Sequence, residues 1–265
     1  RSLRRKFRHT VPHVDSRRLD RRIGTVSPDS APRGDGESGQ AVDTLVSELY
    51  PICRSITGDG VRNTLARLAH HIPLDVVEVP SGTQVFDWTV PKEWNIRDAF
   101  IKNSRGERIV DFQRSNLHVL NYSTPVQARM SLAALRPHLF SIEEHPTWVP
   151  YRTSYYSENW GFCLSHRQRQ GLAPGQYDVL IDTTLEEGSL TYGELVVPGA
   201  SAEEVLVSTH CCHPSVANDN ASGMVLAATL ARRLRGLGPR YSYRFLFVPG
   251  TIGAIAWLAR NEERT

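Results

Sequence analysis

The sequence contains little cysteine or methionine and has no long apolar run. Its 265 residues include four cysteines and two methionines. The cysteines lack the paired spacing of a disulfide framework or a zinc finger, and the adjacent Cys211 and Cys212 cannot easily bridge to each other. We therefore expect free thiols and a cytoplasmic protein, because the cytosol keeps thiols reduced. No apolar stretch approaches the roughly 20 residues that cross a bilayer, so we expect no membrane partner.

Excess charge of one sign is confined to the start of the chain. Residues 1–24 hold nine arginine or lysine residues against two aspartates, whereas the formal net charge of the whole sequence is only +3. The start is rich in Gly, Pro and Ser and has no apolar periodicity, so we predict a disordered basic tail over residues 1–39. Such a tail is compatible with contacts to nucleic acid or acidic lipid. Its composition is more typical of a solvated extension, and we expect no specific nucleic-acid partner.

The remaining residues fall into three segments that differ in their pattern of apolar and turn residues. Residues 40–79 contain two stretches with apolar residues at helical spacing. Residues 80–184 hold short β-like runs broken by turn residues. Residues 185–265 alternate apolar strands with Ala- and Leu-rich helices, an order that is typical of an α/β fold with right-handed crossovers.

The densest chemistry lies in "LVSTHCCHPSVANDNASG", residues 206–223, between an apolar strand and a helix. In open α/β sheets, ligands bind beyond the carboxyl ends of the strands, so this loop is well placed for a function. His210, His213 and Asp219 offer the imidazole nitrogens and the carboxylate oxygens that zinc accepts. The pattern therefore indicates a metal site.

Two other interpretations fit the same residues. Asp219 is a suitable helix N-cap, and the histidines are then ordinary loop residues. Alternatively, Cys212 is a thiol nucleophile with His213 as its base. The thiol interpretation is the weaker one, because neighbours on an extended strand point to opposite faces and Cys212 is expected to face the core. The residues alone leave a metal site and a structural turn equally open.

The segment "STHCCHPSVANDNASG" is similar to the metal-binding segment of an aminopeptidase-like family in the clan of co-catalytic zinc aminopeptidases. Other stretches resemble this family between Thr44 and Arg260, among them "LYPICRSITGDGVRNTL", "GTQVFDWTVPKEWNIRDAFI", "PYRTSYYSENWGFCLSH" and "LEEGSLTYGELVVPG". The resemblance implies a phosphorylase/aminopeptidase-like mixed sheet with helices on both faces. It also implies that a β-rich domain of unknown function, residues 80–184, is inserted into an α/β domain of residues 40–79 and 185–265.

Carried over to this sequence, the resemblance implies that His213 and Asp219 bind metal and that the aspartate bridges two zinc ions. His210 matches an alternative alignment and is a third candidate ligand. The family has Pro-Glu-Thr-Ile-Gly after the next strand, and its glutamate corresponds to the clan's general base. Here the stretch reads "VPGTIG", so Gly250 occupies the glutamate position and no catalytic residue is assigned. Relatives continue with further strands and ligands, so the chain resembles a C-terminally truncated member with an incomplete two-zinc site.

The resemblance implies a zinc-dependent hydrolase of peptide or amide bonds, with a peptide or a small aminoacyl compound as substrate. Because of Gly250 and the missing ligands we expect this form to be inactive, and the sequence leaves open whether it is an enzyme. The alternative is a non-catalytic module that binds a peptide or a saccharide and is linked to polysaccharide biosynthesis. An incomplete sheet would also expose an edge, which favours a homo-oligomer.

Overall fold

A computed structural model describes residues 36–264 of the chain. The predicted tail lies largely outside the described residues. Its last four residues do not: Gly36–Gly39 form the first turn of helix α1 (Gly36–Leu49), so the predicted boundary at residue 40 is wrong there. Gly36 and Gly39 are poor helix formers, which is why local propensity places the helix start too late.

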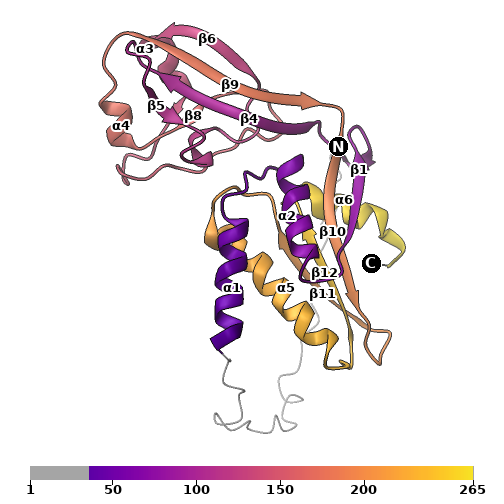
Figure 1. The fold of residues 1–265 in the computed structure, drawn as a ribbon. Coiled ribbons are helices and arrows are strands. Elements are labelled where there is room, and N and C mark those ends of the chain that lie inside the picture. The colour runs from indigo at the N-terminus through magenta and orange to yellow at the C-terminus, as the bar shows by residue number, and fades with distance from the viewer. Residues whose placement is uncertain (1–35, 265) are drawn as a thin grey trace, which may run out of the picture.

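One half of the molecule is an α/β layer structure (Figure 1). Its sheet has the strand order β1 (Asp75–Pro80), β10 (Ser189–Val197), β12 (Ser242–Val248) and β11 (Glu204–His210). β10 runs antiparallel to β1 and β12, whereas β11 and β12 are parallel. The sheet is therefore mixed, as predicted.

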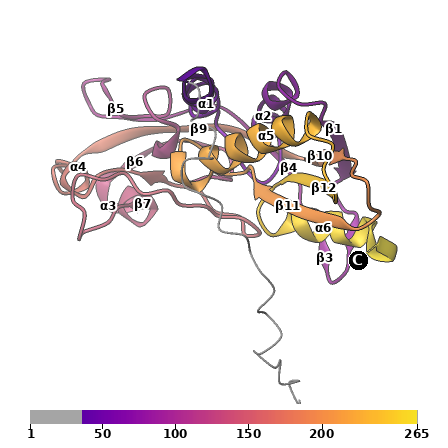
Figure 2. The ribbon, with the colours of Figure 1, turned by 90° about the horizontal axis from the view of Figure 1, so that it is seen from below.

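Helices cover both faces of this sheet, which confirms the predicted fold class (Figures 1 and 2). Helices α1, α2 (Asp59–Ala69) and α5 (Ser222–Arg235) share one apolar core with Phe245 and Phe247 of β12. Helix α6 (Ile252–Arg260) packs on the other face against Leu246 and Val248. The alternation follows from the period of two along a strand, which sends successive side chains to opposite faces.

Strand β11 lies at the edge of the sheet, with β12 as its single neighbour among the described strands. An apolar run such as Val205–Val207 is typical of a buried central strand, but this strand is not one. Val205 and Leu206 are 38% and 51% exposed. An apolar run predicts a strand but carries no information on strand order, because order depends on distant segments.

The second half is built on another sheet, with the order β5 (Arg108–Asp111), β4 (Glu93–Lys102), β9 (Gln176–Glu186) and β6 (Val126–Ser131). All three strand pairs are antiparallel. Short elements complete the described chain: the pairs β2 (Gln84–Val85) with β3 (Trp88–Thr89) and β7 (Leu139–Phe140) with β8 (Phe162–Cys163), helices α3 (Leu132–Leu135) and α4 (His166–Gln170), 3-10 turns at Asn116–His118, Arg136–His138 and Glu262–Arg264, and a π-helical turn at Ala217–Ala221.

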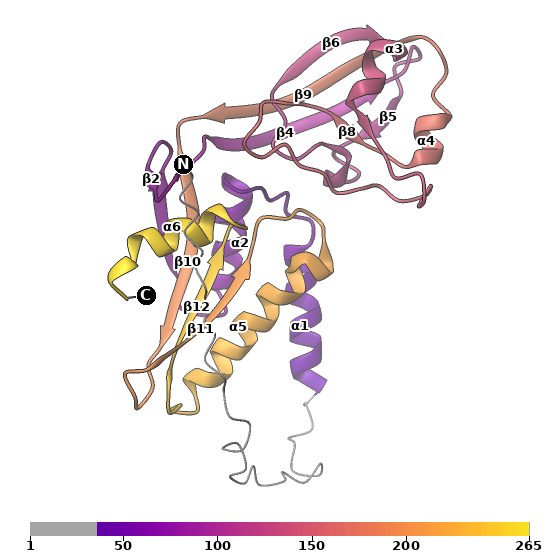
Figure 3. The ribbon, with the colours of Figure 1, turned by 180° about the vertical axis from the view of Figure 1, so that it is seen from behind.

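The two halves are joined by a nearly continuous ribbon (Figure 3). Strand β9 ends at Glu186 in the second sheet, and β10 begins at Ser189 in the first. The hairpin β2–β3 belongs to the linking region but packs on α6, since Val85 and Val90 lie in the same apolar core as Trp257. The predicted limits of the insert, residues 80 and 184, fall close to the ends of β1 and β9.

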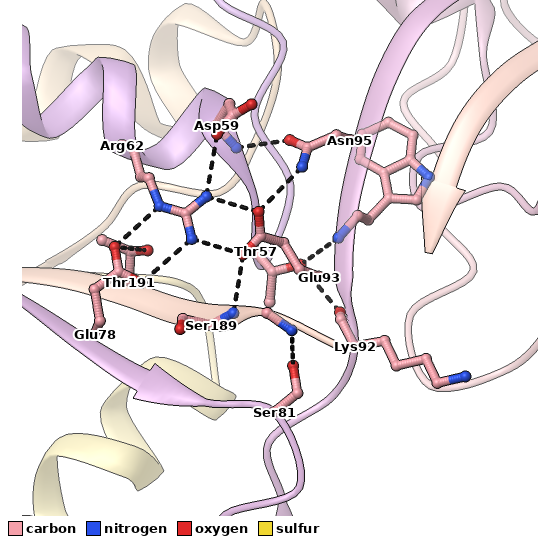
Figure 4. A network of polar contacts seen from close by, with 12 residues as sticks. Thr57, Asp59, Arg62, Glu78, Ser81, Lys92, Glu93, Asn95, Ser189 and Thr191 are labelled. Carbon is pink, nitrogen blue, oxygen red and sulfur yellow. Dashed lines mark hydrogen bonds and ion pairs between the residues drawn. The ribbon is translucent and has the colours of Figure 1, made fainter. Parts of the chain in front are cut away.

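A network of polar contacts crosses the junction (Figure 4). Arg62 of α2 pairs with Glu93 of β4 at 2.6 Å and with Glu78 of β1 at 2.9 Å. The Glu93 carboxylate also accepts from the backbone N–H of Ser189 at 2.9 Å. The hydrogen bonds from Arg62 lower the pKa of Glu93 to about 2, although partial burial of the carboxylate opposes this shift. The network thus links one helix and three strands around a single carboxylate.

No helix within residues 36–264 combines the length and the apolar character that a bilayer span requires.

Candidate metal centre

The strand-end loop lies at the carboxyl end of β11, beside the end of β12. His210 is the last residue of β11 and is in register with Val248 of β12. The backbone N–H of Cys211 donates to the carbonyl of Val248 at 2.9 Å, which extends the pairing by one residue. The loops that follow both strands therefore start side by side, as expected for parallel neighbours.

The structure brings the three predicted ligands into contact. His210 Nε2 lies 2.6 Å from Asp219 Oδ1, and His213 Nδ1 lies 3.1 Å from Asp219 Oδ2. The centroids of the two imidazole rings are 4.6 Å apart. The Asp219 side chain is 59% exposed, whereas the His210 and His213 side chains are 29% and 22% exposed. The carboxylate thus lies between two partly shielded imidazoles and is open to solvent.

The turn that carries Asp219 is positioned by Asn220. The π-helical turn Ala217–Ala221 precedes α5, and Asn220 Oδ1 accepts from the backbone N–H of Gly223 at 3.1 Å. Asn220 Nδ2 donates to Thr209 Oγ1 at 2.6 Å. The capping role therefore falls to Asn220, and Asp219 remains directed at the histidines. This geometry weighs against the interpretation of Asp219 as a simple N-cap.

Cys212 is buried, as expected, but it does not point away from the histidines. Its Sγ lies 3.9 Å from His210 Nδ1, and candidate ligand atoms of His210, Cys212 and His213 all lie within 4.8 Å of one another. The expectation of opposite faces is wrong because residues 211–213 do not continue the strand. Burial raises the pKa of the Cys212 thiol to about 11. A neutral thiol is a poor nucleophile, so the thiol-enzyme interpretation is not supported.

Gly250 lies in the loop that follows β12, beside the loop that follows β11. Its backbone N–H donates to Cys212 Sγ at 3.1 Å. A Cβ atom at this position would meet only Cys212 Sγ, at 3.3 Å, among non-neighbouring atoms within 4 Å. A side chain at residue 250 would therefore begin beside the cluster, which is where a general base belongs. Among the described residues, Asp219 is the carboxylate that contacts the two histidines.

Two residues that the sequence did not point to hold the loop in place. Arg54 is fully buried, and its Nε–H donates to the carbonyl of His213 at 3.0 Å. The Tyr151 ring lies 4.7 Å from the His213 ring, and its hydroxyl is hydrogen-bonded to that of Tyr155 at 2.6 Å. Arg54 follows Cys53 in an apolar stretch, where an isolated arginine is a weak signal. Tyr151 comes from an aromatic segment, and such side chains more often pack in a core than line a site.

The environment favours the neutral imidazole of His213. Burial lowers its pKa, and the neighbouring His210 lowers it further, whereas Asp219 opposes both effects. Neutral imidazole is the form that binds metal ions. Two imidazoles, a carboxylate and a thiol are all donors that zinc accepts, so the residues present fit a zinc ion.

Two cavities lie at the junction of the halves. One, of about 690 Å³, lies between the α2 start and β4 and is lined in part by Asn63, Trp94 and Arg97. The other, of about 340 Å³, is lined in part by Arg114, Asn116 and Ser215. Pro51, Cys53 and Phe112 line both cavities, which are therefore adjacent. Ser215 belongs to the loop of residues 211–219 that carries His213 and Asp219, which we call the metal loop. The smaller cavity therefore lies next to this loop.

The chain is similar to a protein from Clostridium acetobutylicum with which it shares 53% identity over 228 residues. The name of that protein gives it an aminopeptidase-like domain and assigns it provisionally to polysaccharide biosynthesis. The match covers 86% of this chain and 52% of the relative, so the chain spans about half the length of the relative. A crystal structure from Clostridium acetobutylicum, described provisionally as a peptidase, matches with a TM-score of 0.84 at 53% identity, over 86% of this chain and 54% of that one.

More distant structures share the fold. A zinc aminopeptidase from Bacillus subtilis matches with a TM-score of 0.52 at 10% identity, over 81% of this chain and 61% of that one. A peptidase M28 precursor from Shewanella amazonensis matches with a TM-score of 0.53 at 11% identity, over 86% and 71%. The aminopeptidase-like fold predicted from the sequence is therefore confirmed. The family model for a domain of unknown function, DUF4910, matches residues 43–265, and the chain belongs to this DUF4910 family with an aminopeptidase-like fold.

Proposed function

We propose that this chain binds a zinc ion through His210, His213 and Asp219, as part of a hydrolase site for peptide or amide bonds next to a free amino group. The observation that carries the proposal is the position of the Asp219 carboxylate, 2.6 Å and 3.1 Å from two imidazole nitrogens at the end of β11. The aminopeptidase-like fold supports it, because ligands in such sheets bind beyond the strand ends. By analogy with the zinc aminopeptidases of this fold, a second zinc ion would share Asp219.

A bound zinc ion would supply Lewis-acid polarisation of a carbonyl and a water of lowered pKa. The residues of this chain would hold and orient the ion. His213 presents a neutral imidazole, Asp219 presents a negative charge, and Arg54 fixes the loop through the His213 carbonyl. Gly250 has no side chain that accepts a proton, so these residues do not themselves provide a general base. We therefore propose that the chain as given binds metal but does not turn over substrate.

The substrate of the whole protein is proposed to be a peptide or a small aminoacyl compound. The name of the Clostridium relative further suggests a role in the synthesis of a polysaccharide. All four cysteines are free, which is consistent with a reducing compartment such as the cytosol.

A second candidate function is binding without catalysis. The paired cavities at the junction of the halves carry aromatic and amide side chains, and the buried Oδ1 of Asn116 has no hydrogen-bond partner. A saccharide hydroxyl or a peptide N–H would satisfy this acceptor. This alternative predicts ligand binding that is independent of metal.

A zinc competition titration with a fluorescent chelator tests the proposal. We expect Asp219→Ala to lower zinc affinity by at least about tenfold, since even loss of outer-shell partners costs that much. Asp178→Ala is the matched control, because Asp178 is an aspartate of β9 in the other half, with a half-exposed side chain. Equal affinities for the two variants would contradict the proposal.

A further inference from the structure

We propose that Cys212 is a thiolate ligand of the same metal ion. This inference rests on the proposed zinc site and adds a sulfur donor that the His–Asp pattern does not include. On binding, the Sγ–H bond breaks, the proton passes to solvent and an Sγ–metal bond forms. The resulting donor set combines Cys212 with His210 and His213. Asp219 pairs with His210 Nε2, on the ring edge opposite the Nδ1 that faces Cys212.

The distances among the donors suit a zinc ion. Zinc binds sulfur at about 2.3 Å and imidazole nitrogen at about 2.0–2.1 Å, so a tetrahedral ion holds these two atoms about 3.5 Å apart. Cys212 Sγ lies 3.9 Å from His210 Nδ1, and the three candidate ligand atoms lie within 4.8 Å of one another. The donors therefore need to move inwards by about 1 Å or less, which side-chain rotation provides.

The sulfur is prepared for negative charge by a backbone donor. The N–H of Gly250 points at Cys212 Sγ from 3.1 Å, and hydrogen bonds of this kind tune metal-bound thiolates. The absence of a side chain at Gly250 also matters. A side chain at residue 250 would begin 3.3 Å from the sulfur and would fill the space beside it, whereas glycine leaves that space open.

Cobalt(II) reports directly on sulfur ligation. We titrate the unmodified chain with cobalt under argon and expect visible d–d bands of a tetrahedral ion together with a sulfur-to-cobalt charge-transfer band in the near ultraviolet. Cys212→Ser removes the charge-transfer band and lowers zinc affinity by at least about tenfold. Cys211→Ser is the matched control, because Cys211 is an equally buried neighbour that lies outside the cluster, and we expect it to keep both the band and the affinity.

The outcomes separate this inference from the proposed function. If the unmodified chain retains no cobalt and shows no d–d bands, the zinc site itself is wrong. If d–d bands appear without charge transfer, or if the band survives in Cys212→Ser, the metal site stands and the sulfur ligand is overturned.

Cadmium-113 NMR of the unmodified chain tests the sulfur ligand without any substitution, so its result does not depend on whether a variant folds. A sulfur ligand moves the cadmium resonance strongly downfield of the range for oxygen and nitrogen donors. A resonance within the oxygen and nitrogen range overturns the inference.

Discussion

Arg54 and His213 are 159 residues apart in sequence, yet the Nε–H of Arg54 donates to the carbonyl oxygen of His213 at 3.0 Å. A second guanidinium nitrogen, Nη1, donates to the carbonyl of Leu49 at the end of α1. One buried side chain thereby ties the metal loop to the first helix. The position of the His213 imidazole depends on this bond, because the loop around it has no regular secondary structure.

We predict that Arg54→Lys weakens zinc binding by about 10–100-fold, the range for loss of an outer-shell partner. Lysine keeps the charge but cannot bond both carbonyls with the fixed fork of a guanidinium. Competition titration measures the effect, and Arg97→Lys, an exposed pair with Asp182, is the control. Zinc affinity that is unchanged in Arg54→Lys would show that the loop holds its shape without the arginine.

We predict that the chain as given does not hydrolyse aminoacyl anilides with added zinc or cobalt, and that Gly250→Glu alone does not restore turnover. A Cβ atom at residue 250 would lie 3.3 Å from Cys212 Sγ, so the thiol must shift slightly to admit a side chain, and a general base contributes about 10²–10⁴ in rate. The limiting deficit is the metal site, where Asp219 is the single carboxylate that contacts the histidines in residues 36–264. Chromophore release from a panel of anilides is the measurement.

A fusion completes this test. The Gly250→Glu chain is joined to the part of the Clostridium relative that lies beyond the match, and we expect turnover from this fusion alone. Zinc-dependent turnover by the unmodified chain, abolished by His213→Ala, would instead show that Gly250 does not prevent catalysis.

We predict that Glu93→Gln destabilises the protein by about 2–3 kcal/mol at pH 7, since the pKa of Glu93 falls from an ordinary 4.5 to about 2. The folded pKa lies below the unfolded value. The stabilisation is therefore present above about pH 4.5 and is lost as the pH falls through about 2. Urea denaturation at pH 7, 4 and 3 should show the difference between variant and wild type shrinking towards acid.

Glu107→Gln is the control for this series, because Glu107 is also hydrogen-bonded to an arginine but its side chain is 55% exposed. A difference for Glu93→Gln that stays constant from pH 7 to pH 3 would contradict the assigned pKa.

We predict that the edge strand β11 mediates self-association and that Leu206→Lys reduces it. Val205 and Leu206 are exposed beside unpaired strand backbone, and a lysine on an edge strand opposes pairing with another chain. Light scattering during size-exclusion chromatography measures the mass. Leu226→Lys is the control, because Leu226 is 69% exposed on helix α5, which presents no strand backbone for pairing. If both variants reduced self-association equally, the association would be due to nonspecific hydrophobic contacts and not to pairing at the β11 edge.

Local periodicity was sufficient to predict the amphipathic helix α2. Val61, Leu65 and Leu68 recur at helical spacing and are buried on one face of α2. The strand-to-helix loop likewise predicted where His210, His213 and Asp219 would meet, because all three come from one short segment.

The rest depends on contacts between distant segments. Nothing near Glu204–His210 signals that β11 is an edge strand, since strand order is decided by the whole sheet. Arg54 and Tyr151 reach the site from segments about 160 and 60 residues away in sequence, which a single sequence does not reveal. Strand alternation correctly predicted that Cys212 is buried, but it did not predict that the thiol lies close to both histidines, because alternation no longer applies once the chain leaves the strand.

One apolar core crosses the junction: Trp94 and Tyr122 from the β-rich half pack with Ile252 and Trp257 of α6. Excision of residues 81–186 would therefore expose apolar side chains on the α/β half, and we expect that neither piece folds on its own. Differential scanning calorimetry should record a single endotherm whose calorimetric and van't Hoff enthalpies agree, as for one cooperative unit. What looks like an accessory insertion in the ribbon is, thermodynamically, part of the scaffold that carries the metal loop.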